Sequence, residues 1–407
     1  MSFRYWHERA EQSIAHGALT NSKRPQCFVE GIYPTHATYG AKSYLHDTSG
    51  RKYIDFIGAL GTNWFGYGNP KILQSITRSF QSGANLSLSS TLEVEVAEQF
   101  CAQFKLDRLR FCKTGTEACM AAVKIARAYK QSLWDKPNEA KFKILSQGYH
   151  GWADEYISLT PPAAGVPPHE YIAYLRNDYT LSEIASADAV IIEPVIVDDS
   201  PARIEWLRKL IADCHANNTI IIFDETITGI RYKNLAVYLH HQLDPDLVIL
   251  GKAIGGGMPL SIVGGKKQIM EADYFISGSY FGDRVALSAA RTALELAMDT
   301  YSPNWLWDKA QNFITAFNKI SPKLQMVGYP TRGVFQGHEV YKALFWQQAI
   351  RSGILFGPSY FISPDLIPEL DHVLSICEVI EVQTRLSHVK LEGKLPQSSI
   401  IQKMRQL

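Results

Sequence analysis

Two residues whose types can work together in covalent catalysis stand 28 positions apart in the middle of the chain, Asp224 and Lys252. Asp224 follows the apolar run IIIF, and Lys252 follows the apolar run LVIL and one glycine. Such runs predict buried strands, and in an open α/β sheet the ligand crevice lies beyond the carboxyl ends of the strands. We therefore expect both side chains to face one crevice. An amine and a carboxylate there suit pyridoxal phosphate, because the amine forms a Schiff base with the aldehyde and the carboxylate keeps the pyridine nitrogen protonated.

A turn upstream of this pair has the composition of an anion-binding turn. In RFCKTGTEACMAAV a short strand precedes Gly115, and a helical pattern follows it. Backbone N–H groups at a helix start attract an anion, and Thr116 adds a hydroxyl, so we assign Gly115 and Thr116 to the cofactor phosphate. The alternative is an ordinary strand-to-helix turn, with Thr114 or Thr116 as N-cap and Glu117 in the first helical turn.

Further candidates follow other predicted strands. Tyr149, after the run FKILS, offers an aromatic ring that can stack on a flat heterocycle. His150 either assists a proton transfer, hydrogen-bonds near the cofactor or is structural. Glu193 ends the run AVII and either meets the cofactor side or pairs with an arginine such as Arg231. Glu225 points away from Asp224 if the strand continues, which favours a structural role.

The elements that must position these residues alternate between helix and buried strand, which predicts an α/β fold with a parallel sheet covered on both faces. We expect a small-domain segment at residues 1–60, a large domain at 61–300 and a C-terminal small domain at 301–407 that packs with the first segment. The expected strands are 108–112, 143–146, 189–192, 219–223, 247–250 and 261–264, and the expected helices include 115–130, 204–217, 305–320 and 368–386.

Composition narrows the classes of function. The 407 residues carry a formal net charge of +1, so no electrostatic argument supports binding to nucleic acid or to an anionic membrane. The N-terminus lacks an apolar signal core, and no apolar run is long enough to span a membrane, which predicts a cytoplasmic protein. The six cysteines and the pair His240–His241 show no spacing typical of a metal site or a disulfide framework, so we expect no metal and reduced thiols.

Taken together, the segments YLHDTSGRKYIDF, KTGTEA, GYHGWADEY, IIEP, IIIFDETITGIR, LGKAIGGGMPLSIVGGKKQIM and SGSYFGDRVALSAA resemble the class III, fold type I pyridoxal-phosphate aminotransferases. The similarity is greatest to the glutamate-1-semialdehyde 2,1-aminomutase branch. It implies a seven-stranded, mostly parallel sheet, Lys252 as the Schiff-base lysine and Asp224 as the pyridinium partner. It also implies that Ser279 stands where the family has a threonine that reaches the phosphate of the neighbouring subunit, and hence a homodimer with shared active sites.

Departures from the family pattern bear on the reaction. The stretch from Ile157 to Asn177 looks shorter than the mobile lid of the aminomutase, which favours a two-substrate aminotransferase that releases its first product. Its donor is expected to be glutamate, and its acceptor an aldehyde or ketone such as a sugar derivative. An intramolecular aminomutase and a catalytically idle cofactor-binding scaffold are the alternatives. The candidate substrate-binding residues are Asn21, Arg24, Trp64 and Trp152.

Overall fold

The structure is a computed structural model that describes residues 3–133, 142–157, 159, 169–385 and 390–398. The chain forms two compact units, one built from Met1–Asn69 with Asn304–Lys403 and the other built around Pro70–Pro303. Both candidate strands of the sequence analysis, with Asp224 and Lys252, belong to the second unit, which is called the large unit below.

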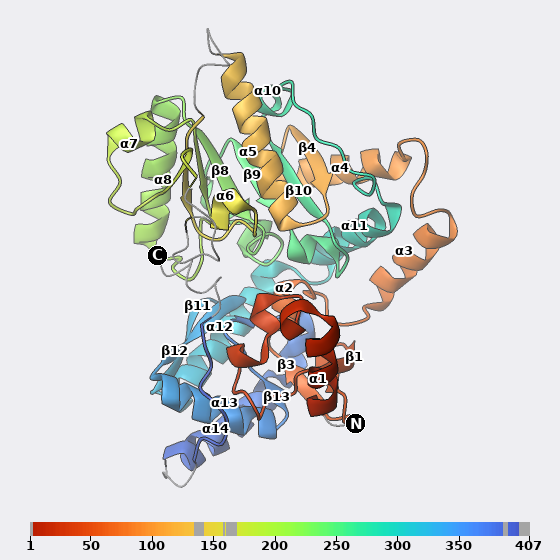
Figure 1. The fold of residues 1–407 in the computed structure, drawn as a ribbon, viewed down its shortest axis with the longest axis vertical. Coiled ribbons are helices and arrows are strands. Elements are labelled where there is room, and N and C mark those ends of the chain that lie inside the picture. Colours follow the sequence, from red (N-terminus) through yellow and green to blue (C-terminus); the bar gives the residue numbers. More distant parts are fainter. Residues whose placement is uncertain (1–2, 134–141, 158, 160–168, 386–389, 399–407) are drawn as a thin grey trace. The chain divides into compact units, whose positions relative to one another are not determined.

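The large unit is organised around a seven-stranded sheet (Figure 1). Its strands are β4 (Arg108–Cys112), β5 (Ile144–Gln147), β6 (Ile172–Tyr174), β7 (Ala189–Ile192), β8 (Ile220–Glu225), β9 (Leu247–Leu250) and β10 (Ser261–Gly265). Their order is β4-β10-β9-β8-β7-β5-β6. β10 runs antiparallel to β4 and β9, whereas the other neighbouring strands are parallel. The mostly parallel, seven-stranded sheet implied by the family resemblance is thus confirmed.

Helices surround this sheet. They are α3 (Pro70–Gln81), α4 (Thr91–Phe104), α5 (Gly115–Ser132), α6 (Asp154–Ile157), α7 (Leu181–Ala185), α8 (Pro201–Ala216), α9 (Val237–His241), α10 (Lys267–Met270) and α11 (Arg284–Asp299), with the 3₁₀ helices η4 (Lys233–Leu235) and η5 (Lys252–Gly255). Every residue of β7, β8, β9 and β10 is buried. Because successive strand side chains point to opposite faces, both faces of these central strands are covered.

Helix α5 lies across the sheet in Figure 1 and buries a side lined mostly by small residues. Ala118, Ala122 and Ala126 are completely buried, and they share one core with the alternate apolar residues of the strands, such as Ile222 and Ile249. Small side chains allow the helix backbone to approach the sheet closely. The start of α5 is therefore held at the carboxyl edge of the parallel strands.

The sequence located six of these strands to within two residues at each end and missed β6. That strand has only three residues, and only its first is fully buried, so it lacks the apolar run that identified the others. The predicted helices 115–130 and 204–217 correspond to α5 and α8.

The other compact unit combines both ends of the chain. Its elements are α1 (Phe3–Ser13), η1 (Ala15–Gly17), η2 (Asn21–Lys23), η3 (Pro25–Cys27), β1 (Ala37–Ala41), β2 (Tyr44–Asp47), β3 (Lys52–Asp55), α2 (Gly58–Gly61), α12 (Pro303–Ile320), β11 (Leu324–Tyr329), β12 (Arg332–Gly337), α13 (Glu339–Arg351), β13 (Ile354–Leu355), β14 (Tyr360–Phe361), η6 (Pro364–Glu369) and α14 (Leu370–Arg385). Strand β13 pairs with β3, so the C-terminal layer packs with the N-terminal segment as expected. The expected helix 368–386 starts two residues too early, because Pro368 lies inside η6 and α14 begins at Leu370.

Candidate active site

The register of the sheet brings three predicted site residues to one edge. Asp224 on β8 lies beside Ile249 on β9, three residues before Lys252. Ile192 on β7 lies beside Phe223, so Glu193 follows its strand at the level of Asp224. Since these strands are parallel, their carboxyl ends meet at the same edge, where an open α/β sheet binds its ligand.

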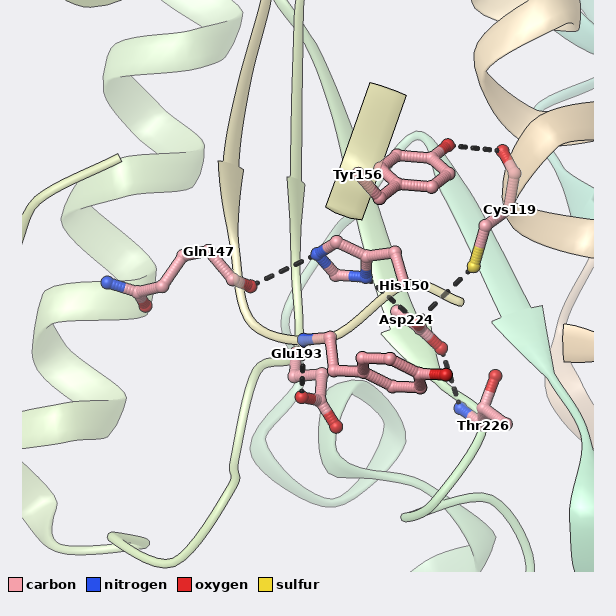
Figure 2. A network of polar contacts seen from close by, with 8 residues as sticks. Cys119, Gln147, His150, Tyr156, Glu193, Asp224 and Thr226 are labelled. Carbon is pink, nitrogen blue, oxygen red and sulfur yellow. Dashed lines mark hydrogen bonds and ion pairs between the residues drawn. The ribbon is translucent and has the colours of Figure 1, made fainter. Parts of the chain in front are cut away.

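The carboxylate of Asp224 accepts three hydrogen bonds (Figure 2). His150 Nδ1 lies 2.9 Å and Cys119 Sγ lies 3.4 Å from Oδ2, while the Thr226 amide donates to Oδ1 over 3.0 Å. Burial alone would raise the pKa of this carboxyl group, but the bonds from His150 and Thr226 and the charge of the imidazole outweigh it and lower the pKa. Asp224 is therefore an anion in a nearly dry site.

His150 is held from both sides of its ring. Its Nε2 lies 3.2 Å from the backbone carbonyl of Gln147, which can only accept, so the Nε2 proton donates there. Nδ1 faces the carboxylate of Asp224, which can only accept a hydrogen bond, so Nδ1 donates to it. The ring also meets Tyr156 edge-on, with 5.6 Å between the ring centroids. Both ring nitrogens of His150 are thus hydrogen-bonded within the protein, and its role towards the cofactor stays a prediction.

Lys252 adopts a backbone conformation that few side chains take. Its φ is 50°, in the left-handed region, directly after β9 and Gly251. For a residue other than glycine this costs about 1 kcal/mol, and such strain is common at active sites. The charge of Lys252 also acts on Cys119, which contacts Asp224. Burial and the charge of Asp224 raise the pKa of the Cys119 thiol well above its usual value, whereas Lys252 lowers it.

The start of α5 forms the helix cap of the structural alternative and is compatible with the anion-binding one. Thr114 is the N-cap and forms a capping box with Glu117, as the structural alternative proposed. That box occupies the amide of Glu117, and within the described part of the chain no acceptor contacts the first-turn amides of Gly115 and Thr116. An ordinary helix cap and two amides available to an anion therefore coexist in one turn.

Thr226 joins this turn to the lysine segment. A Cβ atom added to Gly251 would lie 2.9 Å from Cγ2 of Thr226, and one added to Gly115 would lie 3.3 Å from the same atom. Glycines such as those of GKAIGGGMP allow another part of the chain or a ligand to approach the backbone closely. At Gly251 the close neighbour is Thr226, which the sequence analysis did not single out although it follows Asp224 by only two positions.

The loop after β5 is tied to the neighbouring strand and to α5. The Tyr149 amide donates to Glu193 Oε2 over 2.9 Å, so Glu193 fixes the backbone that carries the Tyr149 ring. Gly151 has a φ of 104°, and a Cβ there would lie 2.3 Å from the Thr116 hydroxyl oxygen. The loop thus packs against the start of α5 at a point where only glycine fits.

Glu225 lies apart from this network. It accepts hydrogen bonds from the Thr228 hydroxyl and from the amides of Val237 and Tyr238, over 2.6–2.9 Å. Burial raises the pKa of this carboxyl group to about 7, against the lowering effect of these hydrogen bonds. The structure confirms that Glu225 has a structural role, namely to hold the start of α9.

The remaining predicted residues are dispersed. Ser279 is exposed in the turn before α11, and Trp152 is 74% exposed. Asn21, Arg24 and Trp64 belong to the other compact unit and stay predictions. Of the shortened lid expected between Ile157 and Asn177, residues 158 and 160–168 lie outside the described part of the chain.

The atoms of Cys119, His150 and Asp224 that could bind a metal all lie within 4.8 Å of one another. Their separations are those of hydrogen bonds, with the thiol and the imidazole both directed at Asp224 Oδ2. All six cysteines are free thiols, and all except Cys101 are buried.

Among the described residues, no helix is both long and apolar enough to cross a lipid bilayer.

This donor set fits pyridoxal phosphate. A carboxylate offers about four acceptor positions, and Asp224 uses three, which leaves one for a pyridinium N–H. The amides of Gly115 and Thr116 suit a phosphate, and Lys252 supplies a primary amine.

Comparison with known proteins agrees with this site. The model of the aminotransferase class-III family matches residues 30–381. Glutamate-1-semialdehyde 2,1-aminomutase of Symbiobacterium thermophilum is 32% identical over 319 residues, which cover 71% of each chain. The FumI protein of Sphingopyxis sp. MTA144, solved in its PLP internal aldimine form, superposes with a TM-score of 0.86 over 97% of this chain and 98% of its own, at 21% identity. An omega-transaminase from Sphaerobacter thermophilus gives a TM-score of 0.81 over 94% and 97%, also at 21% identity.

The sheet, its helices and the residues at its carboxyl edge define a fold type I, pyridoxal-phosphate-dependent protein. The chain belongs to the class III aminotransferases, and pyridoxal phosphate is its cofactor. The family includes both aminotransferases and aminomutases, so the membership leaves the reaction of this chain open.

Proposed function

We propose that this protein is an aminotransferase that moves an amino group from a donor, expected to be glutamate, to an aldehyde or ketone acceptor, of which a sugar derivative is one candidate. The observation that carries the proposal is the buried, ionised Asp224 beside the segment that delivers Lys252. A buried anion is costly unless it has a partner, and the cationic pyridine ring of the cofactor is such a partner.

Each residue of the site has a distinct task in this proposal. When bound, pyridoxal phosphate supplies an aldehyde that bonds to amines and a ring that accepts electrons from the substrate carbon. Lys252 would hold the aldehyde through its Nζ and, once released, would carry a proton to or from the substrate carbon. Its amine is useful in these steps only when neutral.

The other residues bind and orient. Asp224 would hold the proton of the pyridine nitrogen, and the first-turn amides of α5 at Gly115 and Thr116 would bind the phosphate. Tyr149 would stack on the ring from a loop that Glu193 holds in place. His150 keeps Asp224 oriented and ionised.

A homodimer with shared active sites is part of this proposal, and Ser279 would reach the phosphate of the second copy. Exposed apolar side chains support it. Leu88 is 83% and Phe275 is 79% exposed. The loop that carries Leu88 contacts the end of the loop that carries Phe275, where the Arg284 amide donates to Ala84 O over 2.9 Å. A second copy of the chain would remove these side chains from water.

A second candidate function is an intramolecular aminomutase. The observation that favours it is the 32% identity to a protein named glutamate-1-semialdehyde 2,1-aminomutase. A third, from another class, is a catalytically idle protein that binds the cofactor. The two enzymes differ in whether the first product leaves the site, and the idle protein carries out no amino transfer at all.

One experiment separates the three. The purified protein is loaded with the amine form of the cofactor, and carbonyl compounds are screened for return of the visible absorption band. Return of the band with release of an aminated acceptor supports the transferase. Conversion of one amino aldehyde without any keto acid supports the mutase, and a yellow protein that reacts with no donor or acceptor is idle.

Lys252→Ala tests the central residue of all three hypotheses. This variant should lose both the visible band and turnover, whereas Lys124→Ala, at an exposed position on α5, should retain both. A Lys252→Ala protein that kept the band and its activity would refute the proposed role of Lys252.

A further inference from the structure

Cys119 stands in the second turn of α5, on the side that faces the sheet. It is 1% exposed, and its Sγ lies 3.4 Å from Asp224 Oδ2. Asp224 is ionised and can only accept, so the thiol must donate the proton of this hydrogen bond. The sequence analysis expected only a reduced thiol at Cys119, and the sequence signal for another role is its position one helical turn after Gly115.

The thiol is fixed in place by its surroundings. The Tyr156 hydroxyl donates to the backbone carbonyl of Cys119 over 2.9 Å, and the Tyr156 ring packs against His150. Cys119, Tyr156, His150 and Asp224 therefore form a closed ring of contacts from α5, α6, the loop after β5 and β8 (Figure 2). In this ring the imidazole and the thiol approach the same carboxylate oxygen.

We propose that Cys119 is a positioning residue of the reaction, whose S–H donor shares Asp224 Oδ2 with His150 and thereby sets how strongly Asp224 holds the proton of the cofactor ring. A donor to a carboxylate withdraws part of its negative charge. Without the thiol, Asp224 becomes a stronger base and places more negative potential at the cofactor. The inference rests on the proposed role of Asp224 as the partner of the pyridine nitrogen.

The test compares Cys119→Ser, which keeps a donor, with Cys119→Val, which fills a similar volume without one. In the holoprotein, the pH midpoint at which the visible band of the cofactor changes should move upward in Cys119→Val. The expected shift corresponds to an about three- to tenfold higher proton affinity, as for one hydrogen bond. Cys119→Ser should stay near the wild type. A shift of the same size in both variants, or in neither, would overturn the proposal.

Cys214→Ala is the matched control, because Cys214 is a fully buried cysteine on α8 in the same unit. Cys214→Ala should leave the pH midpoint of the visible cofactor band unchanged, although it should lower the stability of the folded protein. An equal shift in this variant would assign the effect to packing and contradict the inference.

A second readout needs no cofactor. In the cofactor-free protein, the infrared S–H stretching band of Cys119, identified as the band lost in Cys119→Val, should move to higher wavenumber in Asp224→Asn, because an amide oxygen accepts more weakly than a carboxylate. A band that does not move would refute the hydrogen bond itself. Because Lys252→Ala tests cofactor attachment separately, failure of the proposed function and failure of this inference are distinguishable.

Discussion

The Nδ1 atom of His150 lies 2.9 Å from Oδ2 of Asp224, and the two side chains are only 1% and 3% exposed. Two groups this deeply buried depend on one another, because removal of one leaves the other without compensation. The His150–Asp224 pair therefore affects both the stability of the large unit and the negative charge of the carboxylate proposed to contact the cofactor.

His150→Ala should lower the free energy of unfolding at pH 7 by about 3 kcal/mol, because it leaves a buried carboxylate with one donor fewer. In the wild type the folded state lowers the pKa of Asp224, so its ionised carboxylate stabilises the folded protein. This stabilisation is fully present above the unfolded pKa of about 4 and is lost as pH falls through the folded pKa. In the variant, burial raises that pKa, so protonation relieves the penalty and the deficit shrinks as pH falls from 7 towards 4. Urea unfolding of cofactor-free protein checks this, and a deficit independent of pH would contradict it.

Two capping boxes of the same composition separate helix stability from cofactor binding. Thr114 caps α5 and Thr180 caps α7, each with a glutamate three residues later. Thr114→Ala and Thr180→Ala should each cost about 1 kcal/mol of stability. Only Thr114→Ala should weaken binding of pyridoxal phosphate, because only α5 starts at the proposed phosphate site. Equilibrium binding of the cofactor to both variants measures the difference, and equal affinities would count against the assignment of Gly115 and Thr116.

Gly151→Ala tests the contact between the loop after β5 and α5. Gly151 and Gly50 both have positive φ, but a Cβ at Gly151 would lie 2.3 Å from the Thr116 hydroxyl, whereas at Gly50 nothing lies within 4 Å. Gly50→Ala should cost only the backbone strain of about 1 kcal/mol. Gly151→Ala should cost more and should also raise the dissociation constant of the cofactor. Thermal unfolding and a cofactor titration of the two variants test this, and similar losses in both would show that the contact has no role.

Glu225 should make the protein less stable as pH rises towards neutrality. Its folded pKa of about 7 lies above the unfolded value of about 4.3, so the folded state binds more protons between these limits. Stability attributable to this group therefore falls with rising pH in that window, by up to about 1.4 kcal/mol per pH unit. Glu225→Gln should remove this slope, and Glu378→Gln, at an exposed position on α14, should not. Melting temperatures from pH 4.5 to 7.5 measure the slopes.

The proposed homodimer predicts that Leu88→Asp yields a monomer. A charge placed at this exposed side chain would be buried without a partner at the interface. Leu181→Asp serves as the control, because Leu181 is 57% exposed on α7 and lies far along the chain from the loops that flank Ser279. Sedimentation velocity should show loss of the dimer only for Leu88→Asp. A dimeric Leu88→Asp protein would remove this surface from consideration.

Local sequence determined the strands and the chemical nature of the site. The runs before Asp224 and before Lys252 are apolar because the central strands are covered on both faces, and such a run can be recognised without any knowledge of its neighbours. β6 was not predicted, because this short strand lies at the edge of the sheet, is only partly buried and has no such apolar run.

Only the tertiary structure decided which side chains contact Asp224. Cys119 precedes it by 105 positions and His150 by 74, and contacts over such separations depend on how α5 and the loop after β5 pack on the sheet. No local pattern distinguishes a cysteine that fills space from one that donates to a carboxylate. Residue types therefore indicated pyridoxal phosphate. The charge of the Asp224 carboxylate depends instead on hydrogen bonds that form only in the folded, buried site, where each donor has a large effect on the pKa of Asp224.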